Sequence, residues 1–425
     1  MMQRLKILIS AYRCSPLQGS EAGVGWGWIT AIAKYHEIWV LCADFHRAEI
    51  QRELKKDPAN YKNVHFCFVS PKFWHYKPSK LWDNIELSIL KPVMNAADKI
   101  WLKDAYALAK EIHEQVKFDL VHQITYVGFR FSGHLWKLDI PFVWGPIGGL
   151  ENTPWRFLPV LGIRGCIEFA GRNIINSIHK AFLPGPKKAF KKARGGIIAA
   201  TEGISKEIQK WYGEQSFVIC EIGPPQNIAS SHTIRNDGDQ LRIAWSGTHT
   251  PGKALPILLQ ALRILQKGVD WHLDIMGIGP CTGVWKALSL KFGLDSRCSW
   301  HGLLSREDAM ELTHKSHIFV ITSMKDLTST VLLEALSQGV PVICPDHCGF
   351  SNVVTEECGF KIPLKSPSQL INGMAQTIQY LAQNEELRQD LARGALKRIR
   401  DYSWDLKAEA INSIYKNVLY NNAST

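Results

Sequence analysis

Runs of apolar, β-branched residues alternate with segments of helical spacing along the whole sequence, and this alternation limits the possible folds more than any other feature. In the first part of the chain the apolar runs predict strands at residues 6–11, 37–42, 64–69, 118–122, 141–144 and 196–200. Helical spacing predicts helices at residues 25–34, 81–116 and 205–211. Strands that alternate with helices favour a parallel, doubly wound sheet.

A second series of the same kind follows a polar, turn-rich stretch at residues 231–240. Its predicted strands lie at 241–246, 272–276, 317–321 and 340–344, and its predicted helices include 254–266 and 330–337. A chain of 425 residues is too long for one ordinary core and fits two domains of roughly 200 residues each. We therefore expect an α/β protein with two doubly wound, Rossmann-like domains, residues 1–230 and 241–401, joined by the linker 231–240 and followed by a final segment, 402–425.

Net charge and cysteine content indicate what kind of partner the protein binds and in which cellular compartment it lies. The formal net charge of +11 favours an anionic partner, such as nucleic acid, an acidic membrane surface or a phosphorylated substrate. The ten cysteines have no disulfide-like spacing, which favours free thiols in a reducing cytoplasm. The apolar run 7–9 is too short for a signal peptide, and no stretch of about 18 apolar residues is present. We expect a cytoplasmic protein whose contact with a membrane would be peripheral, on the inner face.

Residues 155–194 are the main source of the positive charge excess. Nine arginines and lysines stand against a single acid, Glu168, and large apolar side chains are interleaved with them. This pattern suits an interfacial helix on anionic lipid, where each basic residue contributes about 1 kcal/mol near the surface. A pair of solvated basic helices is the alternative. A nucleic-acid partner is not expected, because no recognisable nucleic-acid-binding motif accompanies the charge.

A glycine-rich segment, residues 19–28, follows the first predicted strand. Glycines there allow a ligand to approach the backbone, and the N–H groups at a helix start bind phosphate. The spacing departs from G-x-G-x-x-G, which argues against a nicotinamide cofactor. The segment is therefore interpreted as a phosphate-binding loop or as a simple connector.

The segment 323–336 has the clearest features of a ligand site. It follows an apolar strand, and doubly wound sheets bind ligands at the carboxyl ends of their strands. Its serines and threonines open a helix, where backbone N–H groups and hydroxyls can bind phosphate. Glu334 lies among the apolar residues of 332–336, where a carboxylate is costly unless it binds something, such as the diol of a ribose. An ordinary capped helix with a solvated glutamate is the alternative.

The same segment resembles the E-x7-E signature of the family 4 retaining glycosyltransferases, which have the GT-B fold of two Rossmann-like domains that face a cleft. An acidic residue, here Asp326 in place of glutamate, stands eight positions before Glu334, and the resemblance continues over 334–343. The resemblance implies that Asp326 contacts the donor sugar and that Glu334 binds the ribose hydroxyls. It assigns the diphosphate to the backbone of Leu327, Thr328, Ser329 and Thr330.

Three further segments resemble the donor side of that family. Within 245–255 the family holds the donor phosphates through an arginine and a lysine; Lys253 matches the lysine, and Thr248 stands at the position of the arginine. Segment 276–280 resembles the family's glycine turn, and 301–305 resembles the stretch that lies against the nucleobase. The resemblance therefore adds these donor-binding residues: Gly247, Thr248, Lys253, Gly277 and Leu303.

In this resemblance the first part of the chain supplies the opposite side of the site. The glycine loop faces the cleft, with Gly19, Ser20 and Gly23 near the donor phosphates. Segment 119–126 resembles the stretch around a cleft histidine; many members have two histidines, and here Ile124 takes the place of the second. The candidate catalytic residues are His122, Asp326 and Lys253, and the candidate acceptor-side residues are Glu21, Thr125 and Arg130.

The resemblance implies transfer of a sugar, with retention, from a nucleotide-diphosphate sugar to a saccharide or lipid-linked saccharide in cell-surface polysaccharide or glycolipid synthesis. No metal or other cofactor is expected: the Asp-Gly-Asp motif 237–239 lies in the polar linker, and 344–348 lacks a second Cys/His pair at zinc-finger distance. Residues 402–418 are expected to return to the first domain, as the last helix does in this fold. Two alternatives remain: a sugar-nucleotide epimerase of the same fold, or a catalytically weak nucleotide-sugar-binding scaffold.

Overall fold

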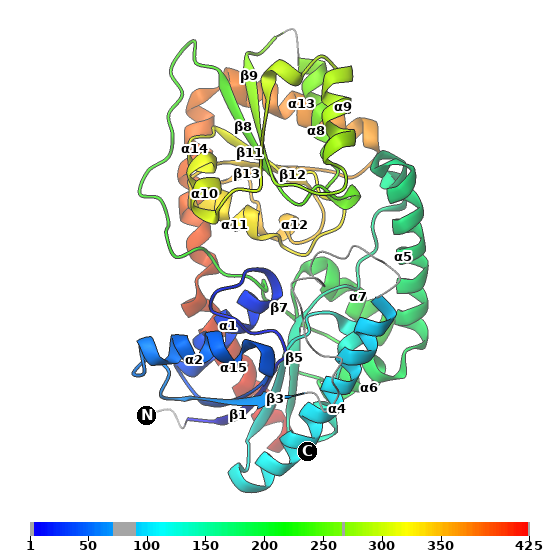
Figure 1. Ribbon diagram of the computed structural model, residues 1–425, viewed down its shortest axis with the longest axis vertical. Helices are drawn as coiled ribbons and strands as arrows, with labels where there is room; N and C mark the ends of the chain where they lie inside the picture. The colour runs from blue at the N-terminus through cyan, green and yellow to red at the C-terminus, as the bar shows by residue number, and fades with distance from the viewer. Residues whose placement is uncertain (1–3, 71–90, 266–267, 424–425) are drawn as a thin grey trace.

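The protein consists of two α/β halves stacked along its long axis, in a computed structural model that describes residues 4–70, 91–265 and 268–423 (Figure 1). Each half contains one sheet, and all of the described strand pairs in both sheets are parallel. Helices follow most strands and cover the sheets. The predicted architecture of two doubly wound, Rossmann-like halves is therefore confirmed.

The first half is built on a seven-stranded sheet in the order β3-β2-β1-β4-β5-β6-β7. Its strands are β1 Lys6–Ala11, β2 Glu37–Ala43, β3 Val64–Val69, β4 Leu120–Thr125, β5 Phe142–Ile147, β6 Ile197–Ala199 and β7 Phe217–Val218. Its helices are α1 Ser20–Ala33, α2 Arg47–Lys56, α4 Lys91–Val116, α5 Gly162–Phe182, α6 Pro184–Lys192 and α7 Glu202–Tyr212. The strand order reverses between β1 and β4, which makes their carboxyl ends the expected ligand-binding edge.

The second half is built on a six-stranded sheet in the order β10-β9-β8-β11-β12-β13. Its strands are β8 Leu241–Ser246, β9 Trp271–Met276, β10 Cys298–Gly302, β11 Ile318–Val320, β12 Val342–Pro345 and β13 Gly359–Ile362. Its helices are α8 Pro256–Ile264, α9 Thr282–Lys291, α10 Arg306–His314, α11 Thr330–Ser337, α12 Phe350–Val353, α13 Pro367–Gln383 and α14 Glu385–Arg398, and the chain ends with α15 Trp404–Ala423. Here the order reverses between β8 and β11.

Most predicted elements are present, with shifted ends. Strands β1 and β8 and helix α11 coincide with their predicted ranges. The helix predicted at 25–34 begins earlier, at Ser20. Of the helix predicted at 81–116, residues 81–90 lie outside the described residues and the remainder forms α4; residue 266 of the helix predicted at 254–266 also lies outside them.

The basic segment 155–194 does not lie wholly with the first half, contrary to the predicted domain division. It forms a 3-10 helix, η5 (Trp155–Leu161), followed by α5 and α6. Phe157, Leu158, Leu161 and Phe169 are buried in the core of the second half, beside side chains of β8 and α8. In Figure 1, α5 runs along the outside of the molecule from one half to the other. The sequence predicted an interfacial helix or a pair of solvated helices for this segment, and it gave no sign that these four side chains enter a core.

The last helix, α15, packs on the first half. Its Ile411, Ile414, Tyr415 and Val418 join the core on one face of the first sheet. Trp404 lies so close to α1 that a Cβ at Gly27 would be 2.1 Å from its ring. The chain therefore passes between the halves four times: before η5, back along α5, through the segment between β7 and β8, and before α15.

Among the described helices, none combines the length and the apolar composition needed to cross a membrane.

Candidate active site

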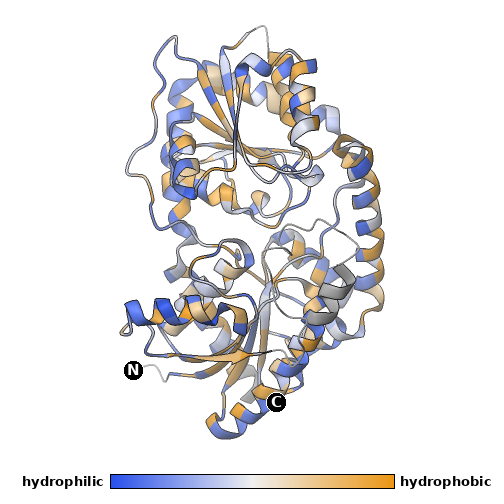
Figure 2. Cartoon of the chain, in the orientation of Figure 1, coloured by the Kyte–Doolittle hydropathy of each residue, from blue (hydrophilic) through white to orange (hydrophobic). Residues whose placement is uncertain are grey.

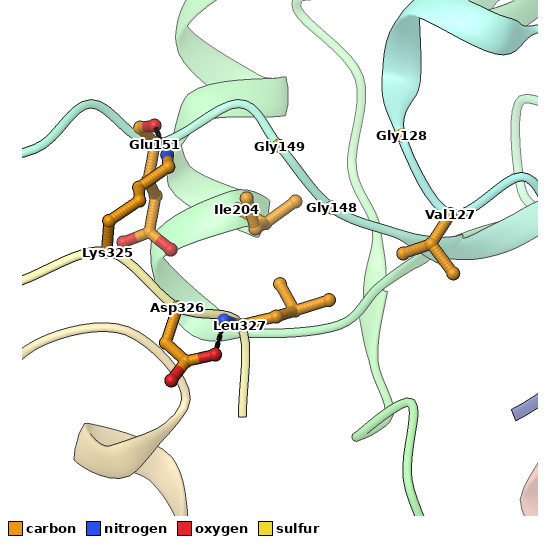
Figure 3. A pocket seen from close by; sticks show the side chains of 9 residues that line it. All are labelled: Val127, Gly128, Gly148, Gly149, Glu151, Ile204, Lys325, Asp326 and Leu327. Atoms are coloured by element: carbon orange, nitrogen blue, oxygen red, sulfur yellow. Dashed lines mark hydrogen bonds between the residues drawn. The ribbon is translucent and has the colours of Figure 1, made fainter. Parts of the chain in front are cut away.

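A pocket of about 210 Å³ lies where the two halves meet. Its lining residues follow the carboxyl ends of β4 and β5 and the start of α7 in the first half, and the end of β11 in the second (Figure 3). These are the edges at which the sheet topology predicts ligand binding. The lining residues are Val127, Gly128, Gly148, Gly149, Glu151, Ile204, Lys325, Asp326 and Leu327.

Two predicted catalytic residues, Lys253 and Asp326, meet at the edge of this pocket. Lys253 Nζ lies 2.5 Å from Asp326 Oδ2, and both side chains are largely buried. They come from the loops after β8 and β11, the two strands at the switch point of the second sheet. The loops are joined by Met324 N–H, which donates to Gly252 O at 2.8 Å, and by the Thr322 hydroxyl, which donates to Lys253 O at 2.6 Å. An ammonium has three donor protons, so Lys253 can hold Asp326 and still bind an anion.

The predicted glycine turns of the second half lie side by side. Gly247 N–H donates to Met276 O at 3.1 Å, and Gly277 N–H donates to Gly302 O at 2.7 Å. Gly277 has φ +114°, and a Cβ there would lie 2.1 Å from Gly247 O, so this turn requires glycine. Leu303 follows and is 78% exposed. The structure thus gathers the loops after β8, β9 and β10 at one edge, with Thr248 exposed on the first of them.

Thr328, in the Ser/Thr segment before α11, does not have its predicted role as a diphosphate-binding residue. The Thr328 N–H donates to Glu221 Oε1 at 2.9 Å and its hydroxyl donates to Oε2 at 2.7 Å. Both groups are buried, and burial raises the pKa of Glu221. Thr328 is therefore satisfied by the protein and is not available to a diphosphate in this conformation. Ser329 is the N-cap residue of α11 and Thr330 is its first residue, and N–H groups at a helix start have no intrahelical acceptor.

Glu334 has a partner that the sequence did not indicate. Its Oε1 lies 3.0 Å from Nε of Arg306, the first residue of α10, and it is only 17% exposed. The carboxylate is therefore not isolated among apolar groups, as its neighbours in sequence suggested. Arg306 was missed because an exposed arginine at a helix start has no distinguishing sequence signal.

The glycines of the segment 19–28 mainly allow close packing of α1 against the loop before it. Ser20 already begins α1, and Gly23 lies inside the helix. A Cβ at Gly23 would lie 2.8 Å from Gln18 O, and one at Gly25 would lie 2.2 Å from Arg13 O. These glycines let α1 pack against the preceding loop, which corrects the phosphate-loop interpretation for Gly23. Gly19 has open space around it and precedes the uncapped start of the helix.

The three predicted acceptor-side residues hold loops around the pocket. The Glu21 carboxylate accepts from the N–H of Val127, a lining residue, at 2.7 Å, and burial raises its pKa. Thr125 is fully buried; its hydroxyl accepts from Arg13 N–H and donates to Arg13 O. Arg130 Nε donates to His179 Nδ1 at 2.8 Å. Thr125 therefore offers no surface to a substrate, and Arg130 is held by α5.

His122 is placed in the core, which corrects its prediction as a catalytic residue. It has no exposed surface, and its Nε2 lies 2.8 Å from Gly145 O. A carbonyl oxygen only accepts, so Nε2 carries the proton and Nδ1 accepts from the Tyr415 hydroxyl at 2.6 Å. Burial lowers the pKa of His122 to about 4, which keeps the ring neutral. His122 joins β4 to β5 and α15 and cannot reach the pocket.

Two charged residues of the pocket, Glu151 and Lys325, were not predicted from the sequence. Lys325 Nζ donates to the backbone carbonyl of Glu151, which links the two halves directly (Figure 3). Burial lowers the pKa of Lys325 and raises the pKa of Glu151. Glu151 follows the glycine turn after β5, and the sequence pattern indicated only a turn there.

Comparisons with known proteins agree with this geometry. Residues 229–398 match the family model described as "Glycosyl transferases group 1". The chain is 21% identical over 319 residues to the uncharacterized glycosyltransferase MJ1178 of Methanocaldococcus jannaschii, covering 74% of this chain and 80% of that protein. It is 23% identical over 291 residues to N,N'-diacetylbacillosaminyl-diphospho-undecaprenol alpha-1,3-N-acetylgalactosaminyltransferase of Campylobacter jejuni, covering 64% and 72%.

Solved structures agree at the level of the fold. Sucrose-phosphate synthase from Thermosynechococcus elongatus aligns with a TM-score of 0.65 at 14% identity, over 98% of this chain and all of that one. The two parallel sheets with a pocket between them give the chain the GT-B fold. Its residues 229–398, which include the second sheet, match the group 1 glycosyltransferases.

Proposed function

We propose that the chain is a retaining, family 4 glycosyltransferase that transfers a sugar from a nucleotide-diphosphate sugar to a saccharide or lipid-linked saccharide. The observation that carries this proposal is the pairing of Lys253 with Asp326 at the switch point of the second sheet, beside the start of α11 and the pocket between the halves. Residues 241–401 bind the donor in this proposal, and residues 1–230 bind the acceptor. The Campylobacter jejuni relative, named for a diphospho-undecaprenol acceptor, supports a lipid-linked acceptor in cell-surface polysaccharide or glycolipid synthesis.

In the proposed reaction the bond between the sugar carbon and the diphosphate oxygen breaks as the bond to the acceptor oxygen forms. The Lys253 ammonium and the free N–H groups at Ser329 and Thr330 stabilise the charge that develops on the departing diphosphate. The Asp326 carboxylate accepts a hydrogen bond from a donor-sugar hydroxyl, and Glu334 accepts from the ribose. The protein's contribution is positional and electrostatic, and we propose that no metal is needed.

A donor screen tests this function. Thermal stability is measured with UDP-, GDP- and ADP-sugars, and the stabilising donor is then assayed for transfer to saccharides and to isoprenoid-diphosphate saccharides, with and without EDTA. Transfer that EDTA does not reduce is expected. Conversion of the donor to its epimer without an acceptor would instead identify an epimerase. No stabilisation and no turnover with any donor would contradict the proposal and favour a scaffold.

Replacing Glu334 with glutamine should weaken donor binding about 10- to 100-fold, because hydrogen bonds to a charged group contribute about 1.5–3 kcal/mol. The loss of the Arg306 pair should add little, since Arg306 is 58% exposed. Calorimetric titration of the donor measures the change. Glu311→Gln is the matched control, because Glu311 of α10 forms an exposed ion pair with Lys315, the residue that follows this helix. Equal affinity in both variants would remove Glu334 from the donor site.

We also propose that the protein attaches peripherally to an anionic membrane through α5 and α6, from the cytoplasmic side. The outer face of α5 is apolar: Ile163 is 84% exposed and Phe182 is 79% exposed. Its spacing of four, seven, four and four residues keeps these side chains on one face of the helix: Ile163, Ile167, Ile174, Ile178 and Phe182. Four exposed lysines of α6 lie next along the chain: Lys187, Lys188, Lys191 and Lys192. In Figure 2 hydrophobic and hydrophilic residues are mixed along α5.

The double variant Ile167→Glu/Ile174→Glu should bind anionic vesicles at least about tenfold more weakly than the wild type, because burying each isoleucine contributes about 1.5–3 kcal/mol. Sedimentation with phosphatidylglycerol vesicles at two salt concentrations measures binding. Val284→Glu on α9 is the control, since Val284 is equally exposed but lies on another helix. Absence of wild-type binding at low salt would end the membrane proposal.

A further inference from the structure

The loop that carries Glu151 is held in place by a row of buried polar side chains on α5. Asn173 exchanges two hydrogen bonds with the backbone of Thr153, at 2.8 and 2.9 Å. Asn176 Nδ2 and Lys180 Nζ both donate to Leu150 O, at 2.9 and 3.0 Å. All three side chains are almost fully buried. The backbone on both sides of Glu151 is therefore fixed, so its side chain has a defined position.

The start of α7 is shaped to receive the Glu151 carboxylate. A Cβ at Gly203 would lie 1.9 Å from Glu151 Oε1, so only glycine leaves room for it. The Thr201 hydroxyl donates to Oε2 at 3.2 Å while it caps α7 by accepting from Ile204 N–H. The carboxylate thus lies near the positive end of a helix, which favours a negative charge there.

One oxygen of the Glu151 carboxylate, Oε1, can still accept hydrogen bonds. Within the part of the chain that the structure describes, Oε1 has no hydrogen-bond partner and the carboxylate has no ion pair. The two nearby cations are engaged by other acceptors: Lys325 bonds the carbonyl of Glu151 itself, and Lys180 pairs with Glu207. A half-buried carboxylate without a cation is costly unless something else binds it. Burial accordingly raises its pKa.

The carboxylate lies in the pocket between the halves, on the wall that comes from the first half. Figure 3 shows Glu151, Lys325 and Asp326 gathered on one side of that pocket. Asp326 comes from the second half, which is the donor side in the proposed function. A hydroxyl that approaches from the first half would therefore meet Glu151 first.

We propose that Glu151 contacts the acceptor: its open oxygen, Oε1, accepts a hydrogen bond from a hydroxyl of the acceptor sugar and thereby orients that sugar toward the donor. This inference rests on the proposed function. It involves no covalent step, because the glutamate only accepts a hydrogen bond. It assigns the two acids of the pocket to different substrates, Glu151 to the acceptor and Asp326 to the donor.

The test compares Glu151→Gln with Glu202→Gln, a control at the exposed first residue of α7. With a donor found by the screen, kcat/KM for the acceptor should fall about 10- to 100-fold in Glu151→Gln, as expected for a lost hydrogen bond to a charged group. Donor affinity by calorimetry and donor hydrolysis by water should stay within about twofold of the wild type. Glutamine preserves the shape of the side chain, and circular dichroism and melting temperature check that both variants fold.

Each outcome decides the assignment. Wild-type acceptor kinetics in Glu151→Gln would overturn it, and a matching loss of donor affinity would move Glu151 to the donor site and also overturn it. If the wild type transfers no sugar from any donor, the proposed function fails, and binding still tests the inference. Saturation-transfer NMR with methyl glycosides of glucose, galactose and N-acetylgalactosamine then compares the two proteins. Weaker binding by Glu151→Gln would support a saccharide contact, and no difference would contradict it.

Discussion

Replacing Lys253 with alanine should lower kcat by about 10²–10³, the usual effect of removing one group that stabilises charge in a transition state. The ammonium lies 2.5 Å from Asp326 and beside the start of α11, where the diphosphate is proposed to depart. The variant also leaves Asp326 as an unpaired, largely buried carboxylate. The measurement is kcat at saturating donor and acceptor, so that weaker ground-state binding does not obscure the effect.

Lys291→Ala is the matched control for this prediction, because Lys291 is an exposed lysine at the end of α9. The double variant Lys253→Ala/Asp326→Ala should lose less than the product of the two single effects, since paired residues do not act independently. A Lys253→Ala enzyme within threefold of the wild type would show that the charge on the leaving group is met elsewhere.

Replacing Phe157 with alanine should destabilise the protein by about 3–5 kcal/mol, the usual cost of deleting a buried aromatic side chain. Phe157 has no exposed surface and lies in the core of the second half, although the sequence around it belongs to a segment predicted with the first. For a domain of this size each kcal/mol lowers the melting temperature by roughly 2–4 °C. Calorimetry or denaturant unfolding measures the change.

Trp155→Ala provides the comparison within the same short helix. Trp155 is 53% exposed, so its loss should change the free energy of unfolding by less than about 0.5 kcal/mol. Equal destabilisation by the two substitutions would mean that η5 does not share the core of the second half in solution. A large loss for Phe157→Ala alone would establish that this segment anchors α5 to the second half.

The fold could be predicted closely because its main signal is local. Continuous apolar runs, which are typical of buried parallel strands, give both ends of β1 and β8 correctly, and the Ser and Thr residues before Val331 mark the start of α11. Strands β10 and β13 were missed, because each has half-buried or exposed positions instead of a continuous apolar run. Such strands are defined by their neighbours in the sheet.

The candidate site was predictable only where residues are close to a recognisable motif. Asp326 and Lys253 belong to such segments, and the fold brings them into contact. The engagement of Thr328 by Glu221 could not be predicted, because the two residues are 107 positions apart and meet only through tertiary folding. The burial of His122 has the same origin, since Tyr415 reaches it from the last helix.

Hydropathy alone would predict the wrong buried face for much of helix α5. Its buried face carries Asn173, Asn176 and Lys180, while isoleucines such as Ile163 and Ile167 point outward. Between Asn173 and Lys180 the usual rule that the apolar face is the inner one is reversed, although Phe169 of the same helix is buried in the core of the second half. The reversal has a cause, because the polar row satisfies the backbone of the loop around Glu151.

The four passages of the chain between the halves limit where this protein can be cut and joined to another to make a chimera. A chimera made by joining the first 230 residues to the second half of another protein would keep Phe157 and Phe169 but remove the core into which they pack. It would also lose Tyr415 and the other α15 side chains that complete the first sheet's core. An exchange that preserves both cores must move residues 155–169 with the second half and keep residues 404–423 with the first half. Each hydrophobic core must therefore be exchanged as a whole, although the segments that form it are not continuous in sequence.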